Sequence, residues 1–114
     1  MLLYCRHMHS PSTPWQVLSS STGVGVLTEG WVLDKPNPGG EPRLFAEEIT
    51  FASPFNSTPV VHIGLTGFDM DQRDSARITL KAENITTTGF KAVIATWEDT
   101  RVFSVEFNWL AIGS

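Results

Sequence analysis

Apolar and polar residues alternate along most of the chain from residue 15 onward, with a period of two rather than the longer period of a helix. Between residues 76 and 85, Ile78, Leu80 and Ala82 alternate with charged and hydroxylated side chains, which is typical of an antiparallel strand with one face in water. Comparable patterns predict strands at residues 43–51, 59–68, 90–97 and 101–112, and a glycine-kinked strand over 15–31. About six short strands separated by turn residues predict an all-β fold, a six-stranded antiparallel β-sandwich.

The last predicted strand, at residues 101–112, is the most apolar one and gives the clearest prediction of core residues. One of its faces is expected to point inward and carries Phe103, Val105, Phe107, Trp109 and Ala111. Trp109 is therefore expected in the core or in a subunit contact rather than in a binding site. In the strand at 59–68, the same reasoning leaves Val60 and His62 on the outer face. This face, with the aromatic-rich last strand, offers more apolar surface than one thin sandwich can cover, so we expect it to mediate assembly.

The chain divides into a short tail and one domain. Residues 1–14 contain two prolines and no regular period, and we predict a flexible N-terminal tail there. The remaining residues, 15–114, are enough for one compact domain with its own core. Within it, the segment DKPNPGGEP at residues 34–42 holds three prolines and two glycines, which predicts an exposed loop. Such a loop either displays binding groups or only connects two strands.

Charge and hydropathy exclude several partners. Twelve acidic side chains against eight basic ones give a formal net charge of −4, so we expect neither nucleic acid nor anionic lipid as a partner. No apolar run is long enough to insert into a membrane, and the opening MLLYCRH is too short an apolar stretch for a signal peptide. We therefore expect a soluble protein, in a compartment that the sequence leaves open. A single cysteine, Cys5, excludes an intrachain disulfide.

The sequence lacks the motifs of the common catalytic and metal sites. It has no glycine-rich phosphate loop, no paired cysteines, no HExxH motif and no nucleophile elbow, so we expect no enzyme and no catalytic residues. The histidines do not form a metal-binding pattern; they are His7, His9 and His62. Asp69, Asp71 and Asp74 resemble a calcium loop only loosely because its glycine and final glutamate are missing, and a solvated turn is preferred. Neither a metal nor another cofactor is therefore expected.

Several short sequence motifs in the predicted strands and turns carry more specific information than the alternation of apolar and polar residues does. ITFASPF at residues 49–55 is followed by TPVV, TGF stands at 88–90, and the last hairpin reads Trp-x2-Thr-x-Val-aromatic-Ser before NWLAI at 108–112. Over residues of about 17 to 113, the chain resembles the H-type lectin domain of invertebrate agglutinins and of the C-terminal part of discoidins. The resemblance implies a sandwich that assembles as a homotrimer. It also implies metal-free binding of galactose or N-acetylgalactosamine in clefts between neighbouring protomers.

The resemblance also assigns site residues in the last hairpin and in the strand before it. It places the family's strand arginine at Arg77 and its hairpin tryptophan at Trp97. The family's histidine after that tryptophan is Glu98 here, and its tyrosine five positions later is Phe103. The carbohydrate site is thus expected to be altered at two positions.

The loop at 34–42 is the third part of the implied site. The family places a glycine and a sugar-binding aspartate in this loop, and an ungapped alignment puts Gly40 at the acidic position. Glu41 follows directly and Asp34 lies nearby, so the carboxylate comes from one of these two or is lost.

Elementary chemistry supports the same residues. A pyranose has one C–H-rich patch and several hydroxyls, so its site needs a flat apolar surface beside planar hydrogen-bonding groups. Trp97 supplies the first, and Arg77 and Glu98 supply the second. Two competing interpretations remain: Trp97 packs against its own hairpin, or Arg77 forms an ion pair with Glu83, Asp99 or a neighbouring chain.

Two other functions compete with a lectin. The changes at Glu98, Phe103 and Gly40 are also compatible with a structural or adhesive trimeric interaction domain that kept the fold and lost the sugar site. A small hydrolase would need two cooperating carboxylates, but the strand pleat would point Glu98 and Asp99 in opposite directions. We therefore predict a carbohydrate-binding lectin for galactose-type glycans and rank the hydrolase last.

Overall fold

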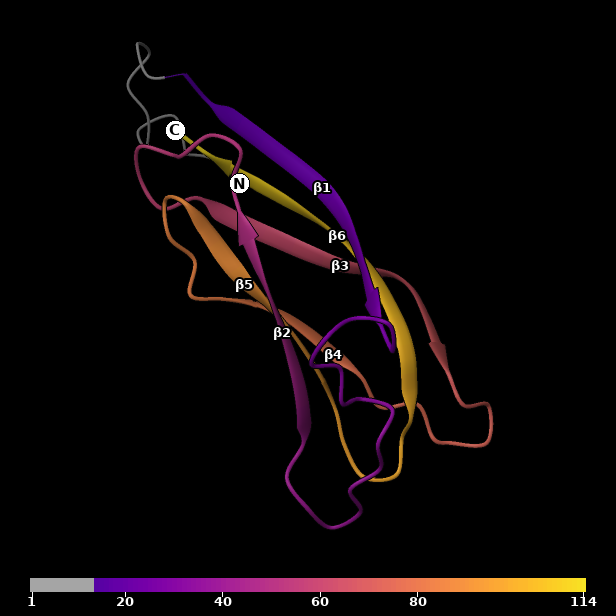
Figure 1. The fold of residues 1–114 in the computed structure, drawn as a ribbon. Helices are drawn as coiled ribbons and strands as arrows, with labels where there is room; N and C mark the ends of the chain where they lie inside the picture. The colour runs from indigo at the N-terminus through magenta and orange to yellow at the C-terminus, as the bar shows by residue number, and fades with distance from the viewer. Residues whose placement is uncertain (1–13) are drawn as a thin grey trace, which may run out of the picture.

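Six antiparallel strands in two sheets make up the computed structural model, which describes residues 14–114 (Figure 1). The strands are β1 (Gln16–Gly25), β2 (Arg43–Thr50), β3 (Val60–Met70), β4 (Thr79–Glu83), β5 (Gly89–Thr96) and β6 (Val102–Gly113). Strands β1, β6 and β3 form one sheet in that order, and β2, β5 and β4 form the other. The predicted six-stranded antiparallel sandwich is confirmed, while the predicted tail lies outside the described residues except for Pro14. No helix in the described part of the chain could span a membrane.

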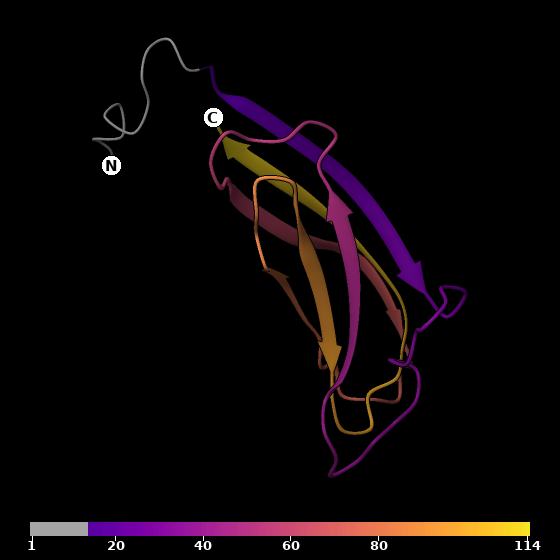
Figure 2. The ribbon, with the colours of Figure 1, turned by 60° about the vertical axis from the view of Figure 1, so that its left-hand side comes forward.

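The two sheets pack face to face, and the core lies between them (Figure 2). Alternate residues of the central strands β5 and β6 point into this layer, where Ile94, Val105 and Phe107 are at most 1% exposed. An aromatic cluster lies in the same layer, with neighbouring ring centroids 5.1 to 5.9 Å apart; its members are Phe51, Phe55, Phe90 and Trp109. Trp109 is 7% exposed, which confirms the expectation that it belongs to the core.

Strand β1 ends earlier than the sequence pattern predicts. The Thr28 N–H donates to the Gly25 carbonyl oxygen at 2.7 Å, and Gly30 adopts a φ of +88°, so residues 26–30 form turns. Trp31 then enters the core, and its indole N–H donates to the Val102 carbonyl oxygen at 2.9 Å. The prediction of one strand over 15–31 is wrong beyond Gly25, because glycine lets the chain turn where the apolar pattern continues.

The start of β6 also departs from simple alternation. Val102 is fully buried and Phe103 is only half-buried, although the sequence pattern assigns Phe103 to the inner face. The pairing of β3 with β6 shifts between Asp69 and Met70, and Met70 pairs with Val102. This irregularity changes which side chains point inward, so the inward assignment of Phe103 is wrong while that of Val105 is confirmed.

The outer face of the β1–β6–β3 sheet is apolar at one end. The register places Val17, Ile112 and Val60 side by side there, and Val17 and Val60 are 58% and 73% exposed. The next row contains Leu110 and His62, which is exposed as predicted. The aromatic residues within this part of β6 point into the core instead, so they do not add the apolar surface that the assembly prediction assigns to them.

Three connections gather at one end of the sandwich, and the start of β1, the β2–β3 connection and the C-terminus lie at the other (Figures 1 and 2). The β1–β2 connection, the β3–β4 connection and the β5–β6 hairpin all reach the first end. Loops held on a rigid sheet scaffold commonly carry binding groups.

Candidate functional site

Five of the six predicted site residues lie at this loop end; they are Gly40, Glu41, Arg77, Trp97 and Glu98. We call this end the tip and define it by residues 34–42, 71–78 and 97–101. The three segments are far apart in the sequence, so the tip exists only in the folded chain.

Glu98 joins the hairpin to the neighbouring loop through both its backbone and its side chain. Its carboxylate oxygens accept from the Gly39 N–H at 3.3 and 3.4 Å, and its carbonyl oxygen accepts from the Asn37 N–H at 3.1 Å. Glu98 has a φ of +58°, a left-handed conformation that is uncommon for residues other than glycine. The strand pleat does not continue through Glu98 and Asp99, so the pleating argument against a shared carboxylate site does not apply. Their carboxylates have separate partners instead, Gly39 for Glu98 and Arg77 for Asp99.

The loop itself forms a tight turn that depends on glycine. Gly39 has a φ of +73°, and the Gly40 N–H donates to the Asn37 carbonyl oxygen at 3.0 Å. A Cβ on Gly40 would overlap the Asn37 side-chain amide, so a larger residue would have to displace that side chain. The Asn37 amide donates to the Glu41 carbonyl oxygen at 3.2 Å, which leaves the Glu41 carboxylate exposed. Since Oδ1 of Asp34 is buried, Glu41 is the more accessible of the two candidate loop carboxylates.

Arg77 lies two residues before β4, and not within a strand as predicted. Its Nη1 donates to Asp99 Oδ1 and to Thr100 Oγ1, both at 2.9 Å. Two buried threonines fix this segment: Thr96 Oγ1 donates to the Arg77 carbonyl oxygen, and Thr100 Oγ1 donates to the Ser75 carbonyl oxygen at 2.7 Å. Within residues 14–114, Nη1 makes all the hydrogen bonds of this guanidinium, and Nε and Nη2 make none. The interpretation of Arg77 as an ion-pair partner of Asp99 is confirmed in the single chain.

Arg43 is a buried residue that the sequence interpretation missed. It is 8% exposed, and its guanidinium donates to the carbonyl oxygens of Leu33, Glu98 and Thr100 at 3.0, 2.9 and 2.8 Å. Burial lowers the pKa of Arg43, while the negative charge of nearby Asp34 acts in the opposite direction. The arginine thus holds the loop and the hairpin tip together through their backbones. The sequence did indicate its burial, because side chains alternate along β2 and Arg43 falls on the same face as the inward-facing Phe45.

Two aspartates of the β3–β4 connection are bound to arginines. Asp71 accepts from Arg73 at 2.7 and 2.9 Å, and Asp74 accepts from Arg101 at 2.8 and 3.1 Å. The hydrogen bond from Arg73 holds the pKa of Asp71 well below its usual range, and that from Arg101 lowers the pKa of Asp74. The Asp74–Arg101 pair ties the connection to the hairpin. Nowhere in residues 14–114 do three or more acidic, histidine or cysteine side chains form a group that could hold a metal ion.

The two aromatic candidates lie in different surroundings. Trp97 is half-buried at the start of the hairpin tip, and its ring contacts no other aromatic ring of the described chain. Phe103 instead lines a depression on the outer face of the β1–β6–β3 sheet, together with Val26 and Phe68. None of the other five predicted site residues lines that depression. Within one protomer, the structure therefore does not place Phe103 among the tip residues.

The tip combines chemical groups that suit a polyhydroxylated ring. The half-buried indole of Trp97 offers a flat apolar surface, Arg77 retains unused donors, and Glu98 and Glu41 supply acceptors. Because buried side chains fix the backbones that carry these groups, little ordering is needed when a ligand binds.

Comparison with known proteins agrees with the sequence motifs. The H-type lectin domain family matches residues 46–112, a range that includes Arg77, Trp97 and Glu98. Discoidin-2 of Dictyostelium discoideum is 32% identical over 112 residues, which cover 96% of this chain and 40% of that protein. A protein described as ATP synthase subunits region ORF 7, from Fuscovulum blasticum, is 47% identical over 76 residues, which cover 67% of this chain and 66% of that protein.

The fold gives a consistent result. A solved structure of recombinant discoidin II of Dictyostelium discoideum superposes with a TM-score of 0.69 at 27% identity, covering 86% of this chain and 36% of that chain. The chain thus spans less than two thirds of the length of each of these relatives.

Proposed function

The chain belongs to the H-type lectin domain family, and on that premise we propose that it is a carbohydrate-binding lectin whose sugar site lies at the tip. The observation that carries the proposal is the placement of Trp97, Arg77 and Glu98 around one hairpin whose backbone is held by hydrogen bonds from the buried Arg43. The family and the discoidin relatives point to a non-enzymatic protein.

Galactose-type glycans are the proposed ligands, bound without a metal ion. The C–H-rich patch of such a ring stacks on Trp97, and its hydroxyls pair with the free nitrogens of Arg77 and with Glu98. Glu41 follows the position where the family places its loop aspartate, and its exposed carboxylate is the proposed replacement. These roles are supported by the accessibility and hydrogen-bonding state of each group in the free protein.

A homotrimer is the proposed assembly, with each site completed in a cleft between protomers. The exposed apolar row of Val17, Ile112 and Val60 supports this proposal, because one sandwich leaves it uncovered. Phe103 lies on a different surface from the tip of its own protomer. It would contact the same sugar only if a neighbouring protomer presents it, so its assignment to the sugar site stays a prediction.

A glycan array followed by calorimetric titration of the bound sugars tests the proposal. Trp97→Ala should weaken sugar binding at least about tenfold, because an edge indole contributes more to stacking than to the core. The melting temperature should change by only a few degrees. The control Trp15→Ala changes an exposed tryptophan at the start of the described chain and should leave the affinity unchanged. Collapse of the fold by Trp97→Ala, with sugar binding retained in the folded fraction, would assign Trp97 to the core instead.

A structural or adhesive trimeric interaction domain is the second candidate. One observation favours it: Arg77 and Glu98 already bind Asp99 and Gly39 in the free protein, so a sugar must share or displace these partners. A protein that sediments as a trimer and binds no glycan on the array would support this second function over the first.

A further inference from the structure

The depression on the outer face of the β1–β6–β3 sheet is separate from the tip, and Phe103 is the one predicted sugar-site residue that lines it. Its volume is about 560 Å³, within the range of small-molecule sites, and no residue of the tip lines it. It lies where β1 ends and β6 begins, at the other end of this face from the apolar row of Val17, Ile112 and Val60.

Glycines on both flanking strands create the depression. The register aligns Gly23 of β1 with Glu106 of β6, and Glu106 with Gly67 of β3, so only Glu106 carries a side chain in that row. In the next row, Gly25 of β1 stands beside Ser104. A glycine within a strand often marks a place where a ligand or another backbone comes close. Here three glycines leave open space beside Glu106 and Ser104 in two successive rows.

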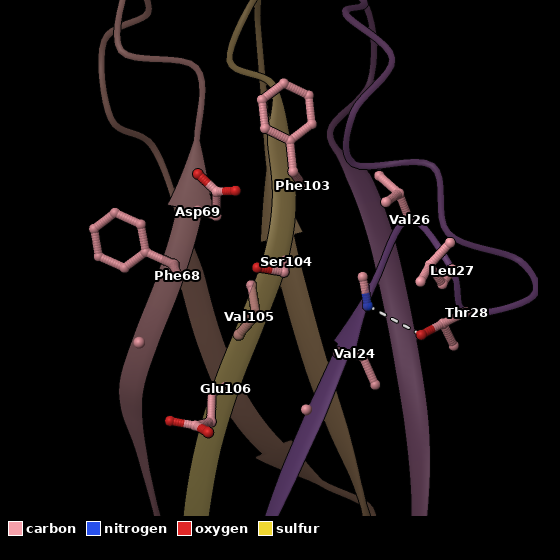
Figure 3. Close-up of a pocket in the computed structure, with 13 residues that line it drawn as sticks. Val24, Val26, Leu27, Thr28, Phe68, Asp69, Phe103, Ser104, Val105 and Glu106 are labelled. Carbon is pink, nitrogen blue, oxygen red and sulfur yellow. Dashed lines mark hydrogen bonds between the residues drawn. The ribbon is translucent and has the colours of Figure 1, made fainter.

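Apolar side chains form the walls of the depression (Figure 3). On the β1 side, Val26 and Leu27 are 50% and 100% exposed. On the β3 and β6 side, Phe68 is 52% exposed and Phe103 is half-buried. Figure 3 shows the Phe103 ring on the β6 side of the Asp69 side chain and the Phe68 ring turned away from β6. Exposed apolar side chains grouped around a hollow favour a ligand with an apolar part.

Two carboxylates, and no basic side chain, line the depression. Glu106 Oε1 accepts from Thr66 Oγ1 at 3.1 Å, so part of its hydrogen-bonding capacity is used. Asp69 is exposed, and its carboxylate has no hydrogen bond or ion pair with any residue of the described range 14–114. Negative charge without a counter-ion, beside apolar walls, is complementary to a positively charged ligand.

We propose that this depression binds a small organic cation with an apolar body, such as a protonated amine on an aromatic or alkyl group. The ammonium group lies against Asp69 and Glu106, where the Phe103 ring adds cation–π attraction. The apolar body covers Val26 and Leu27 and removes their surface from water. A neutral sugar would leave the charge of both carboxylates unbalanced. The site uses no residue of the tip, so this proposal does not depend on the proposed lectin function.

Titration of the full chain with benzylamine tests the proposal, and benzyl alcohol is the matched neutral ligand. Benzylamine at neutral pH should shift the amide resonances of Gly23, Gly67 and Ser104, and benzyl alcohol should bind at least about tenfold more weakly. Asp69→Asn should weaken benzylamine binding about fivefold or more. The control Glu83→Gln, on the other sheet, should not. Equal affinities for the two ligands, or an unchanged affinity in Asp69→Asn, would overturn the proposal.

A steric variant tests the location independently of charge. Gly23→Val should fill the depression without disturbing the fold, because a Cβ there meets no atom within 4 Å. Benzylamine binding should be lost, while the melting temperature and the glycan-array pattern stay unchanged. If methyl galactoside, and not benzylamine, shifts the amides of the depression, the hollow belongs to the sugar site and the proposal fails. It also fails if benzylamine does not bind and Gly23→Val changes the sedimenting mass, since the hollow is then an interface between copies of this chain.

Discussion

At the scale of single residues, Glu98 determines the hydrogen-bonding character of the proposed sugar site. An ionised glutamate only accepts hydrogen bonds, whereas the histidine that the lectin family has at this position can also donate one. Glu98 is held in a left-handed conformation with its carboxylate against the Gly39 N–H. A sugar group that reaches this carboxylate must therefore supply a proton. A galactose hydroxyl supplies one, and the acetamido carbonyl of N-acetylgalactosamine does not.

We therefore predict that the protein prefers galactose over N-acetylgalactosamine, by about 1–3 kcal/mol where the acetamido carbonyl meets the carboxylate. Glu98→His should remove or reverse this preference. Histidine tolerates a positive φ better than most residues, so the variant should keep the turn. Calorimetric titration of both sugars into both proteins measures the effect, and Glu83→Gln is the control for a general loss of charge. The same preference in wild type and Glu98→His would show that this position does not contact the ligand.

At the scale of elements, the hairpin tip is shaped by side chains from outside the hairpin. Arg43 of β2 binds two carbonyl oxygens of the tip, and Asp74 of the β3–β4 connection binds Arg101. These contacts stabilise a turn in which Glu98 has an unfavourable backbone conformation. The site therefore depends on three connections that must fold together.

Replacing Arg43 should destabilise the fold and the site together. Arg43→Met removes three charge-assisted hydrogen bonds, to the carbonyl oxygens of Leu33, Glu98 and Thr100, and the free energy of unfolding should fall by about 2–4 kcal/mol. Sugar affinity of the folded protein should fall as well, because the Glu98 carbonyl oxygen loses one of its two donors. Urea unfolding and calorimetric titration measure the two effects. Arg73→Met removes an exposed arginine and should cost less than about 1 kcal/mol. A similar loss in the two variants would contradict the anchoring role of Arg43.

The Asp74–Arg101 pair should make stability depend on acid. The pKa of Asp74 is lower in the folded protein than in the unfolded chain, so the unfolded chain binds the proton more readily. The pair therefore stabilises the fold above the ordinary aspartate pKa of about 4, and its contribution is lost as the pH falls through the lowered folded value. Asp74→Asn should melt below wild type near neutral pH, with a difference that narrows in strong acid. A difference that stays constant across this range would show that the charge of Asp74 does not stabilise the fold.

At the scale of the whole molecule, a single chain leaves the apolar row of Val17, Ile112 and Val60 exposed to water on the β1–β6–β3 face. Val17 and Val60 are more than half exposed on a flat sheet face, and His62 lies in the next row. A second layer of protein would cover this row. Three sites on one particle would also raise avidity for a glycan-covered surface, on the order of 10² or more where the spacing allows.

We predict a sedimenting mass of three times the 12.6 kDa chain at micromolar concentration. Val60→Asp should give a folded monomer, because it places like charges in the interface. The control Leu44→Asp adds the same charge to an exposed position on β2 and should leave the trimer intact. A monomeric wild type would exclude both the trimer and the sites between protomers.

Features that depend on neighbouring residues could be predicted from the sequence, and features that depend on residues far apart in the chain could not. Strand alternation is a local property, since neighbouring side chains point to opposite faces, and it identified β2 to β6 and the core position of Trp109. It failed for Phe103, where a shift in the pairing of two strands changes the parity. Such a shift depends on a partner strand more than thirty residues away, which the local pattern does not contain.

The sequence by itself determined the all-β sandwich, the lectin family and the residue types that its site can use, because these follow from periodicity and from motifs within single segments. Only the tertiary structure decided which groups are free to bind. It paired Arg77 with Asp99, turned Glu98 into a left-handed conformation, and buried Arg43 between the loop and the hairpin. The physical reason is that these contacts join segments separated by twenty to sixty residues, whose approach depends on the packing of both sheets.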